Sequence, residues 1–424
     1  MIPMITTRSL APGVTLHTLK SDKFKTACFS LNFLKPHDRE NAALDALLPS
    51  VLLRGTEKYP DIRSISSRLD ELYGASLGTL VRRKGEVKLT GFYADFIEEA
   101  FLPAGETVFG PVVEFLSEVL YRPYLEDGGF CPRFVEGEKQ NLMNAIASSL
   151  NNKRSYASKR LLEQMCAGEA YAVPRLGDIE DVKAITPQAL WAHYQTLIRT
   201  ARVEIFYGGR LEADTVAAAF APLFAQGRDY RAQVLATEVP YEVAAVREFS
   251  DSLDVNQGKL VMGLRTGITA DSGDYPALLL LNAVYGAGTT SKLFVNVREK
   301  LSLCYYASSS IDKYKGLMLI SSGIAFENYD TAKSAILEEL EACRRGEISE
   351  LELASARQQI LSSLRAIEDA PVQLDEFYCG NAILPGPTPR QLAERVRELT
   401  LEDLARVAGK LRLDSIYFLK GVEE

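Results

Sequence analysis

The chain has 424 residues, more than a single hydrophobic core usually supports, so its length predicts two or more domains. Its hydrophobic content of 47% and charged content of 25% are typical of a soluble globular protein. The net charge of −8 argues against nucleic acid as a general partner, because such partners call for an excess of Lys and Arg.

No segment predicts a membrane association or export. The densest apolar run, residues 277–281, is far too short to span a bilayer. Residues 1–19 lack the long apolar core and small-residue cleavage site of a signal peptide. We therefore expect a cytoplasmic protein.

Cysteines and histidines are scattered along the chain. The six cysteines form no Cys-x-x-Cys pair, so we expect reduced and mostly buried thiols, as in the cytoplasm. Cys304, in an apolar setting, fits a core thiol better than a nucleophile. The three histidines, His17, His37 and His193, are far apart, so neighbouring residues cannot build a His-rich zinc site.

The first part of the chain predicts a fixed order of elements. An apolar run over residues 27–34 indicates a strand, and leucines and valines at helical spacing indicate a helix over residues 44–52. A Gly-Thr turn follows at residues 55–56. The remaining predicted elements are a helix marked by Ile65, Leu69 and Leu72, strands over 77–82 and 88–93, and a helix over 138–150.

The second part repeats this order. A strand is predicted over residues 259–264, and Pro276 suits the start of a helix over residues 276–285. The later elements are a Gly/Thr turn over 286–289, a helix marked by Leu293, Val297 and Leu301, strands over 303–311 and 317–324, and a helix over 351–364. A repeat of this size indicates duplicated domains.

Adjacent strands and blocks of helices predict an α+β fold. We expect two homologous domains, each a mainly antiparallel sheet with helices packed on one face. Residues 226–248 are polar and include Pro240, so we expect this segment to be a linker between domains over residues 1–225 and 249–424.

Two glycine motifs can be set aside. Residues 74–78 fit Gly-x-Ser-x-Gly, but a nucleophile elbow needs a strand before it and a helix after it, and here the predicted order is reversed. Gly286-x-Gly288 follows a predicted helix and lacks a Gly-Lys-Ser/Thr sequence, so it predicts no nucleotide site.

Residues 46–60, Ala-Leu-Leu-Pro-Ser-Val-Leu-Leu-Arg-Gly-Thr-Glu-Lys-Tyr-Pro, carry a family resemblance. The segment resembles the surroundings of the inverted zinc motif, His-x-x-Glu-His, of the pitrilysin/insulinase metallopeptidases. In that motif two histidines on one helix face bind zinc, and the glutamate is the general base for the zinc-bound water.

The resemblance implies that the zinc site is vacant. Alignment on the Gly-Thr turn places Ala46 and Ser50 at the two histidine positions and Pro49 at the glutamate position. Alanine and proline have no ligand atom, and serine is a poor zinc ligand. Because proline also removes a helical hydrogen bond, we expect the helix to be kinked or broken at Pro49.

A later helix also lacks a zinc ligand at the family position. Residues 138–146 resemble the family helix that carries the last zinc ligand, a glutamate seven residues after another glutamate. Glu138 matches the first glutamate, and Ala145 falls on the ligand position. With all three ligand positions and the base vacant, the resemblance implies no cofactor in this chain and zinc only in a partner subunit.

The second half keeps a substrate-binding segment. Residues 298–305, Arg-Glu-Lys-Leu-Ser-Leu-Cys-Tyr, resemble the family's Arg-Glu-Lys-x-Gly-Leu-x-Tyr, with Ser302 in place of the usual glycine. In the family this arginine and tyrosine bind the substrate backbone and help to stabilise the oxyanion. The resemblance therefore implies that Arg298 and Tyr305 bind substrate. Without it, the usual burial of these residue types would predict that Arg298 is an exposed charge on a helix and Tyr305 a strand residue beside the core.

The resemblance covers nearly the whole chain, and some bacterial and mitochondrial members of the family are heterodimers. It implies a non-catalytic subunit of a heterodimeric zinc peptidase, whose partners are a zinc-bearing paralogous subunit and an unfolded or extended peptide. A homodimer is a further possible assembly. One alternative is an inert structural or peptide-binding scaffold, like the core subunits of the respiratory bc complex. Another is an independent peptidase with other metal ligands, for which the three histidines are the available imidazoles.

Overall fold

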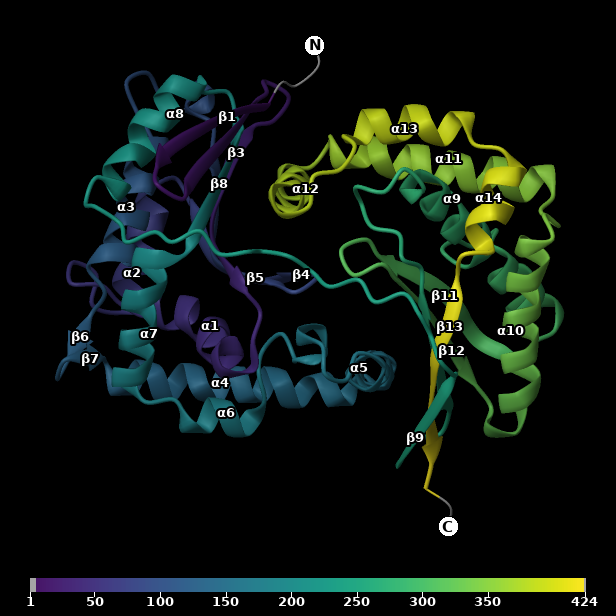
Figure 1. The fold of residues 1–424 in the computed structure, drawn as a ribbon. Coiled ribbons are helices and arrows are strands. Elements are labelled where there is room, and N and C mark those ends of the chain that lie inside the picture. Colours follow the sequence, from purple (N-terminus) through teal and green to yellow (C-terminus); the bar gives the residue numbers. More distant parts are fainter. Residues whose placement is uncertain (1–4, 423–424) are drawn as a thin grey trace. The chain divides into compact units, whose positions relative to one another are not determined.

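The computed structural model describes residues 5–422, which divide into two compact units (Figure 1). Unit 1 comprises the chain up to Ala147, Val173–Ala236 and Ala370–Ile383. Unit 2 comprises Ser148–Ala172, Thr237–Asp369 and the chain from Leu384 onward. Each unit therefore contains a segment from the other half of the sequence.

Unit 1 is built on a six-stranded sheet. Its strand order is β1 (Ile5–Ala11), β2 (Val14–Lys20), β8 (Arg202–Gly209), β3 (Thr26–Pro36), β5 (Val87–Ile97) and β4 (Ser76–Lys84). All neighbours are antiparallel except β2 and β8. β4 is one edge of this sheet, and β1 is the other.

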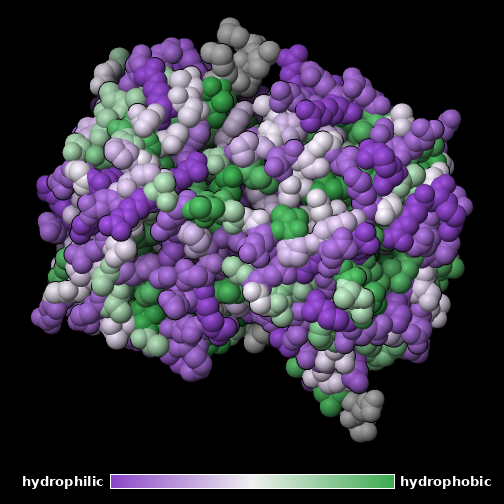
Figure 2. Space-filling model, in the orientation of Figure 1, coloured by the Kyte–Doolittle hydropathy of each residue, from purple (hydrophilic) through white to green (hydrophobic). Residues whose placement is uncertain are grey.

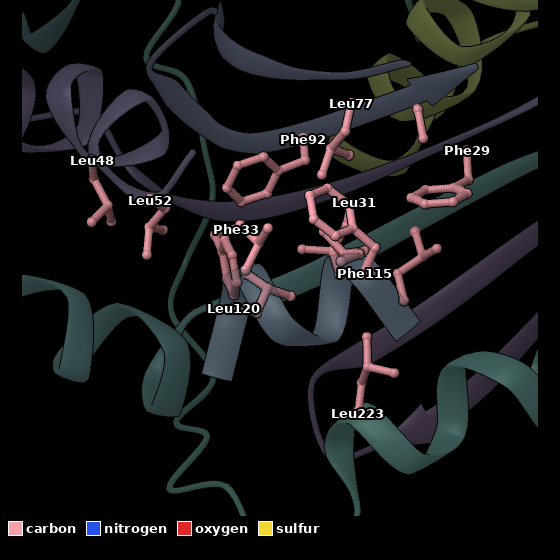
Figure 3. Close-up of a cluster of buried hydrophobic side chains, with 14 of the residues drawn as sticks. Phe29, Leu31, Phe33, Leu48, Leu52, Leu77, Phe92, Phe115, Leu120 and Leu223 are labelled. Carbon is pink, nitrogen blue, oxygen red and sulfur yellow. The ribbon is translucent and has the colours of Figure 1, made fainter. Parts of the chain in front are cut away.

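Helices cover one face of this sheet. Phe29, Leu31 and Phe33 alternate along β3 and pack in the core with leucines of α1 and with Phe115 and Leu120 of α3 (Figure 3). The helices in the main run of the unit are α1 (Arg39–Leu52), α2 (Ile62–Glu71), α3 (Phe109–Tyr121), α4 (Pro132–Asn151), α6 (Ile179–Ala184), α7 (Pro187–Thr200) and α8 (Ala213–Phe220), with short 3-10 turns at Glu99–Phe101 and Ala221–Phe224 and a small hairpin of β6 (Leu125–Glu126) and β7 (Gly129–Phe130).

A helix from late in the sequence packs on this sheet as well. α12 (Pro371–Ile383) contacts β8 and β3, and Tyr378 stacks on Phe206 with ring centres 5.8 Å apart. Ser30, which alternates with the core residues of β3, donates a hydrogen bond to the buried Asp375. Arg82 of β4 pairs with the same carboxylate at 2.8 Å. The sheet is therefore covered on both faces.

Unit 2 is built on a five-stranded sheet. Its order is β11 (Cys304–Asp312), β12 (Leu317–Ile324), β10 (Gly258–Arg265), β13 (Arg412–Gly421) and β9 (Arg247–Leu253), antiparallel except for β13 and β9. The helices that form its core with the sheet are α9 (Tyr275–Tyr285), a π-helix (Leu293–Lys300), α10 (Tyr329–Arg344), α11 (Glu350–Ile367), α13 (Pro389–Glu398) and α14 (Leu401–Ala408), with 3-10 turns at Ala170–Ala172 and Phe326–Asn328.

The N-terminal half of the sequence also contributes a helix here. α5 (Lys153–Met165) packs against β10 and β13. A Cβ at Gly263 would lie 2.4 Å from the Met165 sulfur, so glycine at this point of β10 lets the helix approach closely. Beyond the helix, Glu169 pairs with the buried Arg265 at 2.7 Å, and Arg265 also pairs with Asp414 at 2.8 Å. A buried ionic network thus fixes the end of this segment to the sheet.

The α+β prediction of two mainly antiparallel sheets with helices packed on a face is confirmed, and in unit 1 the second face also carries a helix, α12, which the sequence did not indicate. The strands at residues 27–34, 77–82, 88–93 and 317–324 lie where the sequence placed them. Helix α2 precedes the Gly-x-Ser-x-Gly segment at residues 74–78, and strand β4 begins within it, at Ser76. All six cysteines are buried and free. Residues 226–246 contain no helix or strand.

The surface is predominantly polar on the face drawn in Figure 2, where apolar residues lie in small groups. Within residues 5–422 no helix is both long and apolar enough to cross a bilayer.

Candidate functional site

Helix α1 carries three of the four vacant zinc-motif positions. The side chain of Asp38 caps its N-terminus by accepting a hydrogen bond from the Asn41 amide at 2.8 Å. The helix then runs to Leu52 with Pro49 inside it, so the helix is not broken at Pro49, as one form of the expectation had it.

A side chain on the neighbouring strand explains why proline is tolerated. Proline has no N–H, so the carbonyl of Asp45, four residues earlier, loses its helical donor. The hydroxyl of Thr90 on β5 donates to that carbonyl at 3.1 Å. Both residues are buried, and the hydrogen bond from the sheet therefore removes the cost of leaving this carbonyl without a partner.

The four vacant positions form no metal site. Ala46 and Pro49 are buried, Ser50 is half-buried and Ala145 on α4 is exposed. Within residues 5–422, no three His, Cys, Asp or Glu side chains are placed to hold a metal ion. Glu138, which matches the first glutamate of the family helix, instead pairs with Arg54 at 3.1 Å and joins α4 to the turn after α1.

A buried ion cluster fixes α1 to its surroundings. The Asp45 carboxylate is 1% exposed and lies 2.8 Å from Nε2 of His193 and 3.4 Å from the Lys35 ammonium. Burial acts to raise the pKa of Asp45, but the His193 hydrogen bond and the Lys35 charge hold it below its ordinary value. The negative charge of Asp45, next to Ala46, is thus already paired with protein groups.

The other two histidines lie in separate places. His17 contacts Glu204 at 2.7 Å, and Nε2 of His37 donates to the carbonyl of Val173 at 3.1 Å. Burial lowers the pKa of His37 to about 4. The structure therefore does not bring the three imidazoles together.

The segment with Arg298 and Tyr305 begins with the π-helix. The Leu301 amide donates to the Asn296 carbonyl, five residues earlier, at 3.0 Å. π-helical turns are rare and often occur at functional sites. Ser302 follows with a φ of +52°, in the left-handed region, which gives the physical reason that glycine is usual at this position.

Arg298 and Tyr305 lie side by side. The Arg298 Nε donates to the Tyr305 carbonyl at 2.9 Å, and its guanidinium lies 4.6 Å from the centre of the Phe294 ring and 3.0 Å from Glu299. Tyr305 is 69% exposed. It occupies a bulge in β11, because Cys304 pairs with Ile324 and Tyr306 with the next residue, Gly323. β11 is an edge strand, so the pair lies at an accessible sheet edge.

One group near this pair was not singled out by the sequence. The guanidinium of Arg154 on α5 lies 4.2 Å from the ring centre of Tyr306 and donates to the hydroxyl of Ser308 at 2.6 Å. Arg154 and Ser308 are 154 positions apart, so no local pattern could connect them.

Known proteins with similar sequences define the family. Residues 184–360 match the family model described as Peptidase M16 inactive domain. A probable inactive metalloprotease of Bacillus subtilis, YmfF, is 34% identical over 412 residues, which cover 97% of this chain and 96% of that protein. The chain belongs to the M16 peptidase family. The resemblance to pitrilysin/insulinase peptidases is thereby confirmed.

Solved structures agree with the fold of this M16 protein. A conserved protein from Enterococcus faecalis superposes with a TM-score of 0.91 at 29% identity, over 99% of both chains. A peptidase M16 inactive domain from Pseudomonas fluorescens superposes with a TM-score of 0.81 at 19% identity, over 99% of this chain and 98% of that one. The second likeness concerns the fold alone.

Proposed function

We propose that this M16 protein is the non-catalytic subunit of a heterodimeric zinc peptidase, in which it supplies Arg298 and Tyr305 to the active site of a zinc-bearing paralogous subunit. The observation that carries the proposal is the exposure of Tyr305 at an edge-strand bulge, where Arg298 is bonded to its carbonyl. A large aromatic side chain on a strand is ordinarily buried, so its exposure beside a fixed cation suits a binding role.

The state of α1 supports a role without catalysis in this chain. The positions of the zinc ligands hold alanine and serine, the position of the base holds proline, and Thr90 has taken over the bond that proline removes. The adjacent Asp45 is bonded to His193 and Lys35. This helix is stabilised as part of a core, which supports a partner subunit as the source of the zinc chemistry.

The Arg298 and Tyr305 side chains have the donors that peptide hydrolysis needs. A guanidinium and a phenol aimed at a developing alkoxide stabilise the transition state by about 2.7–4 kcal/mol per donor in a water-poor site. The bond from Arg298 to the strand and its position over Phe294 restrict the guanidinium before substrate arrives.

The neighbouring strand offers a surface for the peptide. Among residues 5–422 no strand pairs with the outer side of β11, so an extended peptide can add to the sheet there by main-chain hydrogen bonds. This proposal takes an unfolded peptide as the substrate class and places the complex in the cytoplasm.

Co-purification of the tagged chain, followed by mass spectrometry, tests for the partner. We expect a protein with His-x-x-Glu-His, and the mixture should cleave peptides while neither chain does so alone. Arg298→Ala should lower kcat of the mixture by about 100-fold, and Tyr305→Phe should also lower it. Arg390→Ala, on α13, removes an exposed charge elsewhere in unit 2 and should have no effect.

Three results would reject the proposal. Stoichiometric zinc in the purified chain would indicate an independent peptidase. An unchanged kcat after Arg298→Ala, or a homodimer with no zinc-bearing partner, would favour the scaffold function.

A further inference from the structure

The cations around Tyr306 have no acidic partner. The Arg154 guanidinium lies 4.2 Å and the Lys259 ammonium 5.8 Å from the centre of the Tyr306 ring. Within residues 5–422, the contacts of these two cations are with neutral oxygens: Arg154 with Ser308, and Lys259 with Gln257. Two like charges at one aromatic ring are unfavourable unless an anion joins them.

The sheet holds these groups in place. Tyr306, Gly323 and Lys259 are paired across β11, β12 and β10, so they form one row on one face of the sheet. A Cβ at Gly323 would lie 2.5 Å from the Tyr306 ring, so the glycine allows the ring to lie against the sheet. Arg154 reaches the ring from the first turn of α5.

Two hydroxyls lie in the same place. The Tyr306 hydroxyl lies beside that of Ser321, which is 8% exposed. Burial, and then the charge of Arg154, lower the pKa of Lys259, which agrees with a cation that lacks a counter-charge among the described residues.

We propose that Arg154, Lys259 and Tyr306 form a recognition site for a carboxylate of a bound peptide. Arginine and lysine donate charge-assisted hydrogen bonds to carboxylates, and the aromatic ring provides an apolar wall for the chain that carries the carboxylate. The ligand is a peptide rather than a nucleic acid, because the chain has a net charge of −8 and the site adjoins the free edge of β11.

This inference rests on the proposed function in taking a peptide as the ligand, and it adds a substrate class. The carboxylate can come from the C-terminus of the peptide or from an acidic side chain. In either case the peptides bound by this subunit carry a negative charge beside the segment that adds to β11.

Fluorescence anisotropy with the full chain tests the site. The probes are a fluorescein-labelled Gly/Ser/Ala peptide with a free C-terminal carboxylate, the same peptide as a C-terminal amide, and the amide with one internal glutamate. The free acid or the glutamate peptide should bind roughly tenfold or more tightly than the plain amide. Whichever acidic probe shows the gain identifies the source of the carboxylate.

Single variants separate the site from general charge effects. Arg154→Gln and Lys259→Gln should each remove most of the tenfold gain and leave the affinity for the plain amide unchanged. Arg390→Gln removes one positive charge from α13 and should keep the gain. Thermal melting verifies that each variant is folded.

Three outcomes would overturn the inference: equal affinities for both acidic probes and the amide, a gain that survives Arg154→Gln, or displacement of the amide and the acids alike by inorganic phosphate. These results concern the isolated chain. They are independent of the cleavage assay on the mixture, so the proposed function can fail while the carboxylate site stands, and the reverse.

Discussion

Replacing Thr90 by valine tests how α1 accommodates Pro49. The substitution keeps the shape of the side chain and removes the hydroxyl that donates to the Asp45 carbonyl at 3.1 Å. Because Pro49 has no N–H, that carbonyl then has no donor from the helix and none from the sheet. Thr90 is 2% exposed, so water cannot easily replace the lost bond.

The expected cost is about 1–3 kcal/mol of unfolding free energy, the usual penalty for a buried polar group without a partner. In a Pro49→Ala background the residue-49 amide can donate to the same carbonyl. There Thr90→Val should cost about 0.5–1 kcal/mol, as for an ordinary side-chain hydrogen bond. The midpoints of these two ranges differ by about 1 kcal/mol, which is the coupling that the double-mutant cycle predicts.

Urea unfolding followed by tryptophan fluorescence provides the assay. The chain has one tryptophan, Trp191 on α7, which stacks on Tyr194 and packs against the unit 1 core, so the signal reports unit 1. Thr18→Val is the matched control, because the Thr18 hydroxyl is also buried but has no hydrogen-bond partner in the part of the chain that the structure describes, and its loss should cost little. Additive effects of Thr90→Val and Pro49→Ala would refute the explanation.

Two further substitutions test the left-handed turn and the buried lysine. Ser302→Gly should stabilise unit 2 by about 1 kcal/mol because glycine accepts the φ of +52° without strain, whereas Ser302→Ala should not stabilise it. Urea unfolding followed by circular dichroism measures both effects, and an equal gain in the two variants would show that the Ser302 backbone is not strained. Lys88 is fully buried, and burial lowers its pKa from 10.5 to about 8, so between these values the unfolded chain binds more protons. The wild type should therefore gain stability relative to Lys88→Met as the pH rises from 8 to 10.5, and it should show no such trend between pH 6 and 7. A difference in melting temperature between the two proteins that stays constant from pH 8 to 10.5 would contradict the lowered pKa.

Patterns within short stretches of sequence determined much of this protein. Helical and alternating spacing of apolar residues located the elements of both halves, and their repeated order indicated the duplicated α+β architecture. The resemblance to the family motif implied a vacant zinc site from the residue types at positions 46, 49, 50 and 145, since a ligand set is a matter of residue type at fixed spacing. The resemblance of residues 298–305 to the family segment singled out Arg298 and Tyr305, and in the structure Arg298 donates a hydrogen bond to the Tyr305 carbonyl.

Contacts between distant positions were decided only by the tertiary structure. The rule that proline interrupts a helix failed at Pro49 because Thr90, on a different element, supplies the missing bond. The packing of α5 in unit 2 and α12 in unit 1 depends on glycine clearance and buried ion pairs on the sheets, which leave no periodic signal in the helices themselves. Arg154 meets Tyr306 for the same reason: side-chain contacts between separate elements depend on how those elements pack, and spacing along one segment does not encode them.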